Sequence, residues 1–216
     1  MTKRPLFNRL VLRARGAARL LQDRAYDVAF GIQTQVSPAS GVPNPADRNA
    51  RHEPISYSAL AEIKSHIALG ADDVFYDIGC GYGRALGYFA REQIAGCVGV
   101  ELVPELARRA VINGQYLRGR RASITVRTGD AATQSYGGGT IFFMYNPFSA
   151  EVMALVLERI NRDRGARAVQ VVYANPVASV VFDQCGWLTL KETFRVPYRG
   201  ATMETRLWQS RTAVPS

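Results

Sequence analysis

The stretch from Val74 to Arg84 reads Val-Phe-Tyr-Asp-Ile-Gly-Cys-Gly-Tyr-Gly-Arg, and it decides the fold. Its first five residues form an apolar run with β-branched and aromatic side chains, which is typical of a buried parallel strand. Three alternating glycines follow, at Gly79, Gly81 and Gly83. Apolar residues at helical spacing come next, and glycine lets the backbone between the two elements turn sharply and approach a ligand. The stretch therefore predicts a strand, a glycine-rich turn and a helix N-terminus that together form a nucleotide-binding corner.

The spacing of the glycines separates two kinds of such corner. A dinucleotide fingerprint, G-x-G-x-x-G/A, ends on a small residue that lets helix and strand pack closely around a pyrophosphate. Counted from Gly79, that position holds Arg84, which is large and which we expect to be exposed. Asp77 stands two residues before the first glycine, and a carboxylate is a better neighbour for a cation than for a pyrophosphate. The spacing therefore favours a cationic ligand over a dinucleotide.

Two further acids each follow a predicted strand. The residues 97–100 read as the second strand and lead into Glu101, about twenty residues past the glycines, where an acid reaches ribose hydroxyls. Asp130 follows a third predicted strand at 123–127. One alternative is that Asp77, Glu101 and Asp130 are ordinary acids at strand ends. We favour a shared ligand site, because all three end predicted strands.

The pattern Asp-x-Gly-x-Gly-x-Gly-Arg, with its downstream acids, resembles motif I of the class I S-adenosylmethionine-dependent methyltransferases. The resemblance extends over about residues 55–209 and implies a three-layer Rossmann-like α/β fold, with a mostly parallel seven-stranded sheet and a C-terminal antiparallel hairpin strand. It implies S-adenosylmethionine as the cofactor, which carries an ammonium and a sulfonium but no phosphate. The cofactor-binding residues that it implies are Tyr57, Asp77, Gly79, Cys80, Gly81, Gly83, Glu101, Leu102, Asp130, Ala131 and Asn146.

Asn146, Pro147 and Phe148 end the fourth predicted strand, at 140–145, where a methyl acceptor is expected. The element resembles the Asn-Pro-Pro-Tyr/Phe element of amine- and amide-directed methyltransferases with one proline missing. It is also similar to the Asn-containing turn of the non-SET histone-lysine methyltransferases. An asparagine amide can accept a hydrogen bond from an amine without adding charge, so we take the three residues as candidate catalytic residues. The alternative is a rigid turn after a strand.

The resemblance implies transfer of a methyl group to nitrogen, most readily to the lysine amine of a protein, although the acceptor itself is unknown. Three other functions stay open: an RNA methyltransferase, a membrane-associated small-molecule methyltransferase, and a non-catalytic S-adenosylmethionine-binding interaction module. An RNA substrate is disfavoured by charge, since residues 25–216 carry only +3 of the chain's net charge of +9.

Residues 1–54 are predicted to form a basic helix-and-loop extension that precedes the methyltransferase domain at 55–216. The first 24 residues hold seven Lys and Arg against one Asp, and their apolar residues recur at a helical period. Such a helix can cap the domain, lie on an anionic membrane surface or contact nucleic acid. We favour the cap, with weak contact to a membrane or RNA through residues 1–24 as the second possibility and a transit peptide as the third. Residues 26–35 are expected to pack on the domain, and 37–54 to form a lid or a disordered loop.

Composition sets the remaining bounds. The chain has 216 residues, 47% of them hydrophobic and 21% charged, which suits one α/β domain with a full core. No apolar run reaches the about 18 residues that a membrane span needs. Cys80, Cys97 and Cys185 lie far apart without metal-ligand spacing, so we predict no metal and a reducing, cytoplasmic location, with a peripheral membrane position as the alternative.

Overall fold

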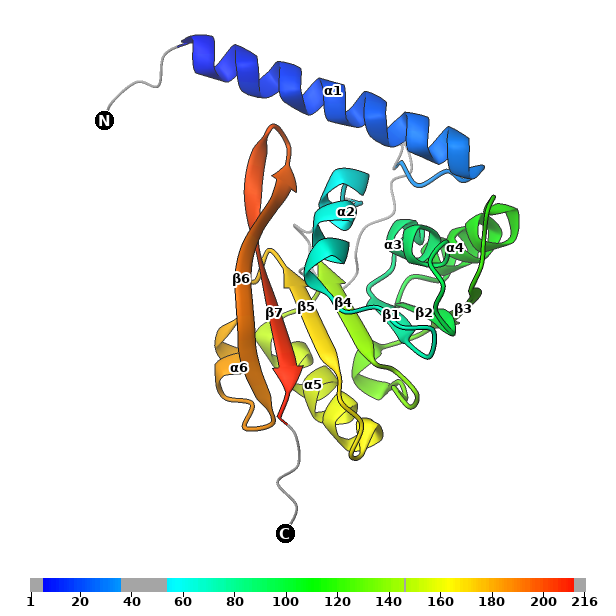
Figure 1. The fold of residues 1–216 in the computed structure, drawn as a ribbon, viewed down its shortest axis with the longest axis vertical. Helices are drawn as coiled ribbons and strands as arrows, with labels where there is room; N and C mark the ends of the chain where they lie inside the picture. The colour runs from blue at the N-terminus through cyan, green and yellow to red at the C-terminus, as the bar shows by residue number, and fades with distance from the viewer. Residues whose placement is uncertain (1–5, 36–53, 146, 212–216) are drawn as a thin grey trace.

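The computed structural model describes the backbone of residues 6–10 and all atoms of residues 11–35, 54–145 and 147–211 (Figure 1). The predicted residue Asn146 therefore lies outside the described part of the chain, as do residues 1–5 and 36–53, which include all but the last residue of the lid or loop predicted at 37–54.

A seven-stranded sheet with the order β3-β2-β1-β4-β5-β7-β6 forms the centre of the molecule. The first five strands run parallel to one another, whereas β7 pairs antiparallel with both β5 and β6. This confirms the predicted sheet, including its C-terminal antiparallel hairpin. The strands are β1 (Val74–Ile78), β2 (Gly96–Glu101), β3 (Ser123–Thr128), β4 (Ile141–Tyr145), β5 (Gln170–Ala174), β6 (Leu188–Tyr198) and β7 (Ala201–Ser210).

Helices cover both faces of this sheet, so the predicted three layers are confirmed (Figure 1). Side chains alternate between the faces along each central strand, as a pleated strand requires. Phe75 and Phe143 join the core under α2 and α3, whereas Tyr76 and Phe142 join the core under α5 and α6. The elements are α2 (Tyr57–His66), α3 (Arg84–Phe89), α4 (Pro104–Tyr116), the 3-10 turn η2 (Ala131–Thr133), α5 (Ala150–Arg164) and α6 (Val180–Asp183).

The N-terminal helix α1 (Leu6–Phe30) lies across the edge of the sheet at which β4 and β5 end (Figure 1). Near its middle, Arg19 donates a hydrogen bond to the carbonyl of Ala201 at the tip of the β6–β7 hairpin. At its end, Phe30 and the following Ile32 are buried in the same core as α2 and α3, as expected for residues 26–35. The boundary between extension and domain at residue 54 stays a prediction. Within the described residues no helix is long and apolar enough to cross a membrane.

Candidate functional site

A cavity of about 450 Å³ opens at the carboxyl ends of the parallel strands. Its walls come from the ends of four of them, because Asp77 lies on β1, Glu101 on β2, Asp130 after β3 and Tyr145 on β4. β1 has β2 on one side and β4 on the other. The strands after β1 are added first on one side of it and then on the other, so the strand order reverses at β1. Ligands of open α/β sheets bind at such a position, and the volume is in the range of small-molecule sites.

The glycine turn after β1 depends on glycine for two physical reasons. Gly79, Gly81 and Gly83 all have positive φ angles, of 84°, 53° and 79°, which side chains other than glycine adopt only with strain. At Gly79 a Cβ atom would also lie 2.7 Å from Cβ of Pro147, which belongs to the segment after β4. The backbone of Gly79 therefore packs directly against the Pro147 ring. Both residues line the cavity.

Glu101 holds the glycine turn in place. One oxygen of its carboxylate accepts a hydrogen bond from the Gly81 amide at 2.8 Å, and the other accepts one from the Val103 amide at 2.9 Å. Burial raises the pKa of Glu101, and these amide hydrogen bonds oppose that rise. Gly81 and Gly83 do not themselves line the cavity; they shape the turn that does.

Asp77 is a buried carboxylate at the cavity wall, with 5% of the residue exposed. Burial, together with the nearby charge of Glu101, raises the pKa of Asp77 to about 8. Within the described residues, no hydrogen bond reaches this carboxylate. A cation in the cavity would favour its charged form, so the site suits a positively charged ligand.

The other predicted cofactor residues also line the cavity, namely Cys80, Leu102, Asp130 and Ala131. Asp130 is exposed, and its carboxylate accepts a hydrogen bond from the Ala132 amide at 2.9 Å, which caps η2. Burial raises the pKa of the Cys80 thiol well above its usual value, so this cysteine packs as a neutral group.

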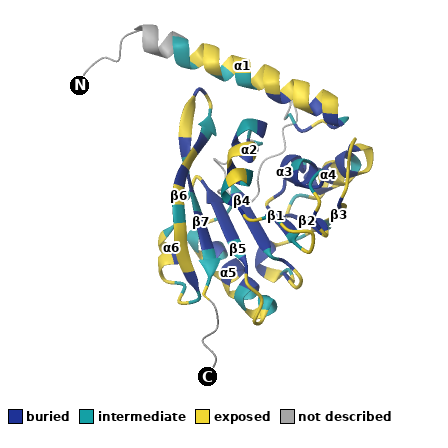
Figure 2. Cartoon of the chain, in the orientation of Figure 1, coloured by how far each residue is buried: buried dark blue, intermediate teal, exposed yellow. Residues whose placement is uncertain are grey.

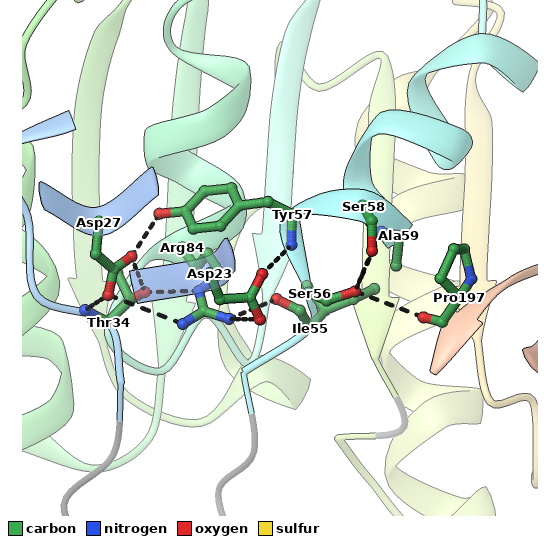
Figure 3. Close-up of polar contacts among 10 residues, drawn as sticks. All are labelled: Asp23, Asp27, Thr34, Ile55, Ser56, Tyr57, Ser58, Ala59, Arg84 and Pro197. Atoms are coloured by element: carbon green, nitrogen blue, oxygen red, sulfur yellow. Dashed lines mark hydrogen bonds and ion pairs between the residues drawn. The ribbon is translucent and has the colours of Figure 1, made fainter. Parts of the chain in front are cut away.

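Arg84 was expected to be exposed, and that expectation is wrong, because only 3% of this residue is accessible. Its Nε donates to the Thr34 hydroxyl at 2.6 Å, and its Nη1 donates to the Asp23 carboxylate at 3.2 Å and to the Ile55 carbonyl at 3.0 Å. Figure 3 shows Asp23 and Asp27 of α1 pointing toward this guanidinium. Residues of the extension therefore replace water around Arg84, which no analysis of the glycine motif alone could predict.

One nitrogen of the Arg84 guanidinium makes no hydrogen bond with the described residues around it. Nη2 of Arg84 lies 3.9 Å from the Asp27 carboxylate and has no hydrogen-bond partner among the described residues. Arg84 also lines the cavity, together with Thr34. One amino group of this buried guanidinium therefore makes no hydrogen bond within the described chain.

Tyr57, which was predicted to bind the cofactor, does not line the cavity. It is 1% exposed, and its hydroxyl donates to the Asp27 carboxylate at 2.7 Å (Figure 3). Of the three candidate catalytic residues, Pro147 and Phe148 line the cavity and Asn146 lies outside the described residues. Two cavity residues that the sequence analysis did not select, Asn175 and Tyr198, come from the end of β5 and the tip of β6.

No protein-family model matches the chain, and no curated protein matches it in sequence. Solved structures do match in fold. An RNA methyltransferase from Salinibacter ruber in complex with S-adenosyl-L-homocysteine is 20% identical, with a TM-score of 0.57 over 76% of this chain and 97% of the other. The tRNA methyltransferase TrmK of B. subtilis is 15% identical, with a TM-score of 0.56 over 71% and 65%. The magnesium protoporphyrin IX methyltransferase from Synechocystis PCC 6803, with bound SAM, is also 15% identical, with a TM-score of 0.53 over 71% and 77%. The chain therefore has the Rossmann-like α/β fold of these methyltransferases, as its sequence predicted.

Proposed function

We propose that this chain is an S-adenosylmethionine-dependent methyltransferase. The observation that carries the proposal is Asp77, a buried carboxylate with a raised pKa beside a triple-glycine turn in a cavity of about 450 Å³. A ligand with fixed positive charge removes the cost of ionising such a carboxylate, whereas a pyrophosphate increases it. The fold match with proteins whose structures contain SAM or S-adenosyl-L-homocysteine supports the same ligand.

The charges of the cavity fit the whole cofactor. Asp77, Glu101 and Asp130 supply carboxylates from three successive strands for the cationic groups and hydroxyls. Arg84, a cationic side chain in the cavity wall, is the proposed partner of the cofactor's own carboxylate. The cofactor supplies an activated methyl group, and the protein has to align donor and acceptor and exclude water.

The proposed acceptor is an amine, with a protein lysine favoured. Arg84 is the only cationic side chain among the described residues that line the cavity, and it already pairs with Asp23. An acidic cavity attracts an amine and repels a phosphate backbone. The aromatic rings of Tyr145, Phe148 and Tyr198 supply apolar surface for the aliphatic stem of a lysine. The comparisons give no support to the histone-lysine type in particular.

Two measurements test the proposal. Calorimetry should detect binding of S-adenosylmethionine and S-adenosylhomocysteine, and no binding of a nicotinamide or flavin nucleotide. Labelled methyl groups should then enter the protein fraction of a lysate, at lysine by mass spectrometry, and not the RNA, lipid or small-molecule fractions. Uptake of a dinucleotide in place of the methyl donor would overturn the cofactor assignment. Label in another fraction would overturn the acceptor alone, and tight binding without transfer would indicate a non-catalytic module.

A further inference from the structure

Helix α1 packs on the domain through an unusually polar face. Apart from Val11, the described positions that are at least half-buried follow one side of the helix at spacings of three and four residues: Leu12, Gly16, Arg19, Asp23, Asp27 and Phe30. Two of them are carboxylates that are each 5% exposed and are held by Arg84, Tyr57 and Thr34. A helix normally buries its apolar stripe and exposes its acids, and here the acids are inside.

The apolar stripe of α1 consequently faces solvent. Along the opposite side run six exposed residues, none of them polar: Ala14, Ala17, Ala18, Leu21, Ala25 and Val28. Leu21 is 65% exposed and Val28 is 74% exposed. Figure 2 shows α1 on the outside of the molecule, with most of its described residues exposed.

Arginines border this stripe on both sides. Arg13 and Arg24 follow one margin and Arg15 lies at the other, and all three are exposed. Both acids of α1 are buried against the domain, so no carboxylate of the described helix lies near the stripe. The first 24 residues of the sequence carry a net charge of +6. An apolar strip with cationic margins is complementary to an anionic lipid surface, where aliphatic side chains enter the acyl region and arginines contact phosphates.

We propose that the outer face of α1, formed by Ala14, Ala17, Ala18, Leu21, Ala25 and Val28 with Arg13, Arg15 and Arg24, docks on an anionic lipid bilayer. The stripe runs along the helix from Ala14 to Val28, so α1 lies flat along the membrane surface. Between the arginines the stripe has no aromatic or polar side chain that could stack on a base or hydrogen-bond to its edge, and this favours lipid over nucleic acid.

Docking in this way fixes the orientation of the domain. The α1 helix crosses the edge of the sheet at which the cavity opens, and the Arg84 cluster ties it to the glycine turn (Figures 1 and 3). The helix therefore brings that edge of the domain to the membrane. This inference concerns binding only and does not depend on the proposed methyl transfer.

Co-sedimentation of the full chain with lipid vesicles tests it. The probes are phosphatidylcholine vesicles with and without phosphatidylglycerol, and we expect at least tenfold stronger binding to the anionic ones, falling with salt. The double variant Leu21→Glu/Val28→Glu should lose this binding to the level of the neutral vesicles. Arg13→Glu/Arg15→Glu/Arg24→Glu should do the same. The matched control is Leu155→Glu/Val180→Glu, which places two glutamates at residues 50% and 57% exposed on α5 and α6 and should bind as the unmodified chain does.

The thermal unfolding temperature of each variant is measured to check that α1 stays packed on the domain. It should equal that of the unmodified chain, because every substituted residue is solvent-exposed. Equal binding to neutral and anionic vesicles would overturn the proposal. So would unchanged vesicle binding of both α1 variants, binding of RNA in place of vesicles, or a concentration-dependent dimer that Leu21→Glu/Val28→Glu dissociates while vesicles are not bound. Cofactor binding by calorimetry is measured on the same samples, so failure of the docking surface is distinguished from failure of the methyltransferase proposal.

Discussion

Arg84 and Asp23 lie 61 residues apart in the chain, and Nη1 of the arginine donates to a carboxylate oxygen of the aspartate at 3.2 Å. Their side chains are 3% and 7% exposed. Arg84 directly follows the third glycine of the turn, and Asp23 belongs to α1. This ion pair therefore links the N-terminal helix to the segment that shapes the cavity, and α1 is a structural part of the site's surroundings.

Asp23→Ala tests this link. The substitution leaves the Arg84 guanidinium buried without its carboxylate partner and leaves the Tyr57 amide without its acceptor. Breaking a buried pair in this way costs about 3–5 kcal/mol of unfolding free energy. Chemical denaturation measures the loss, and calorimetry should show weaker S-adenosylmethionine binding. The control Arg24→Ala changes an exposed neighbour on the same helix and should cost less than about 0.5 kcal/mol. Equal stability of the two variants would show that the ion pair is dispensable.

Gly79→Ala tests two reasons for glycine at this position, the positive φ angle and the close contact with Pro147. Gly138→Ala is its matched control, because both glycines have a φ of 84°. A Cβ atom at Gly138 meets nothing within 4 Å, whereas at Gly79 it meets Pro147 at 2.7 Å. The control should therefore cost only the strain of the left-handed conformation, about 1–2 kcal/mol. Gly79→Ala should cost more and should also weaken cofactor binding at least tenfold, since Pro147 or the turn must move. Similar cofactor binding by both variants would contradict the close packing of Gly79 against Pro147.

Much of the fold was readable from the sequence because its signals are local. Val74–Ile78 is a mainly apolar run followed by a glycine-rich turn, and the structure has β1 at those residues. The acids Asp77, Glu101 and Asp130 were placed together because parallel strands end at the same edge of a sheet, and all three line the cavity.

The environment of Arg84 could not be read in the same way. Its burial depends on Asp23, Thr34 and Ile55, which come from a helix and loop distant in sequence and carry no local signal for the contact. The orientation of α1 was hidden for a related reason. The sequence shows the helical period of α1 clearly. Asp23 and Asp27 nevertheless face the domain, because Arg84 and Tyr57 bind their carboxylates there. The helix therefore buries acids and exposes apolar residues, which is the opposite of the usual arrangement.

Tyr57→Phe distinguishes the sequence-based expectation for this residue from its structural setting. The hydroxyl donates to the Asp27 carboxylate at 2.7 Å, and burial raises its pKa far above the usual value. Loss of a hydrogen bond to a charged group should cost about 1.5–3 kcal/mol of stability. Cofactor affinity should stay unchanged, because Tyr57 does not line the cavity. Tyr116→Phe, at a residue that is 71% exposed, is the control and should alter neither quantity. A tenfold loss of cofactor affinity in Tyr57→Phe would instead support the predicted cofactor contact.

Comparing Asp77→Asn with the unmodified protein measures how the buried Asp77 carboxylate makes the unfolding free energy depend on pH. In the ligand-free protein the pKa of Asp77 is about 8, whereas in the unfolded chain it is about 3.9. Between these values the native protein holds a proton that the unfolded chain has lost, so the unfolding free energy falls as pH rises from about 4 to about 8 and levels off above that. Asp77→Asn removes this contribution, and its stability advantage over the unmodified protein should grow across the same window. Glu101, whose pKa is also raised, is present in both proteins, so their difference reports on Asp77 together with its interaction with Glu101.

The same substitution should act in the opposite direction on ligand binding. A bound cation favours the charged form of Asp77, so binding of S-adenosylmethionine to the unmodified protein should strengthen as pH approaches 8, relative to Asp77→Asn. The titration of the ligand's own amine is common to both proteins and cancels in this comparison. At pH 8 the variant should bind about 1–3 kcal/mol more weakly, through loss of a charge-assisted contact. Asp72→Asn, which changes an exposed acid before β1, should follow the unmodified protein at every pH. A stability difference between Asp77→Asn and the unmodified protein that stays constant from pH 5 to pH 9, with unchanged affinity, would remove the buried carboxylate from the binding site and with it the main support for a cationic methyl donor.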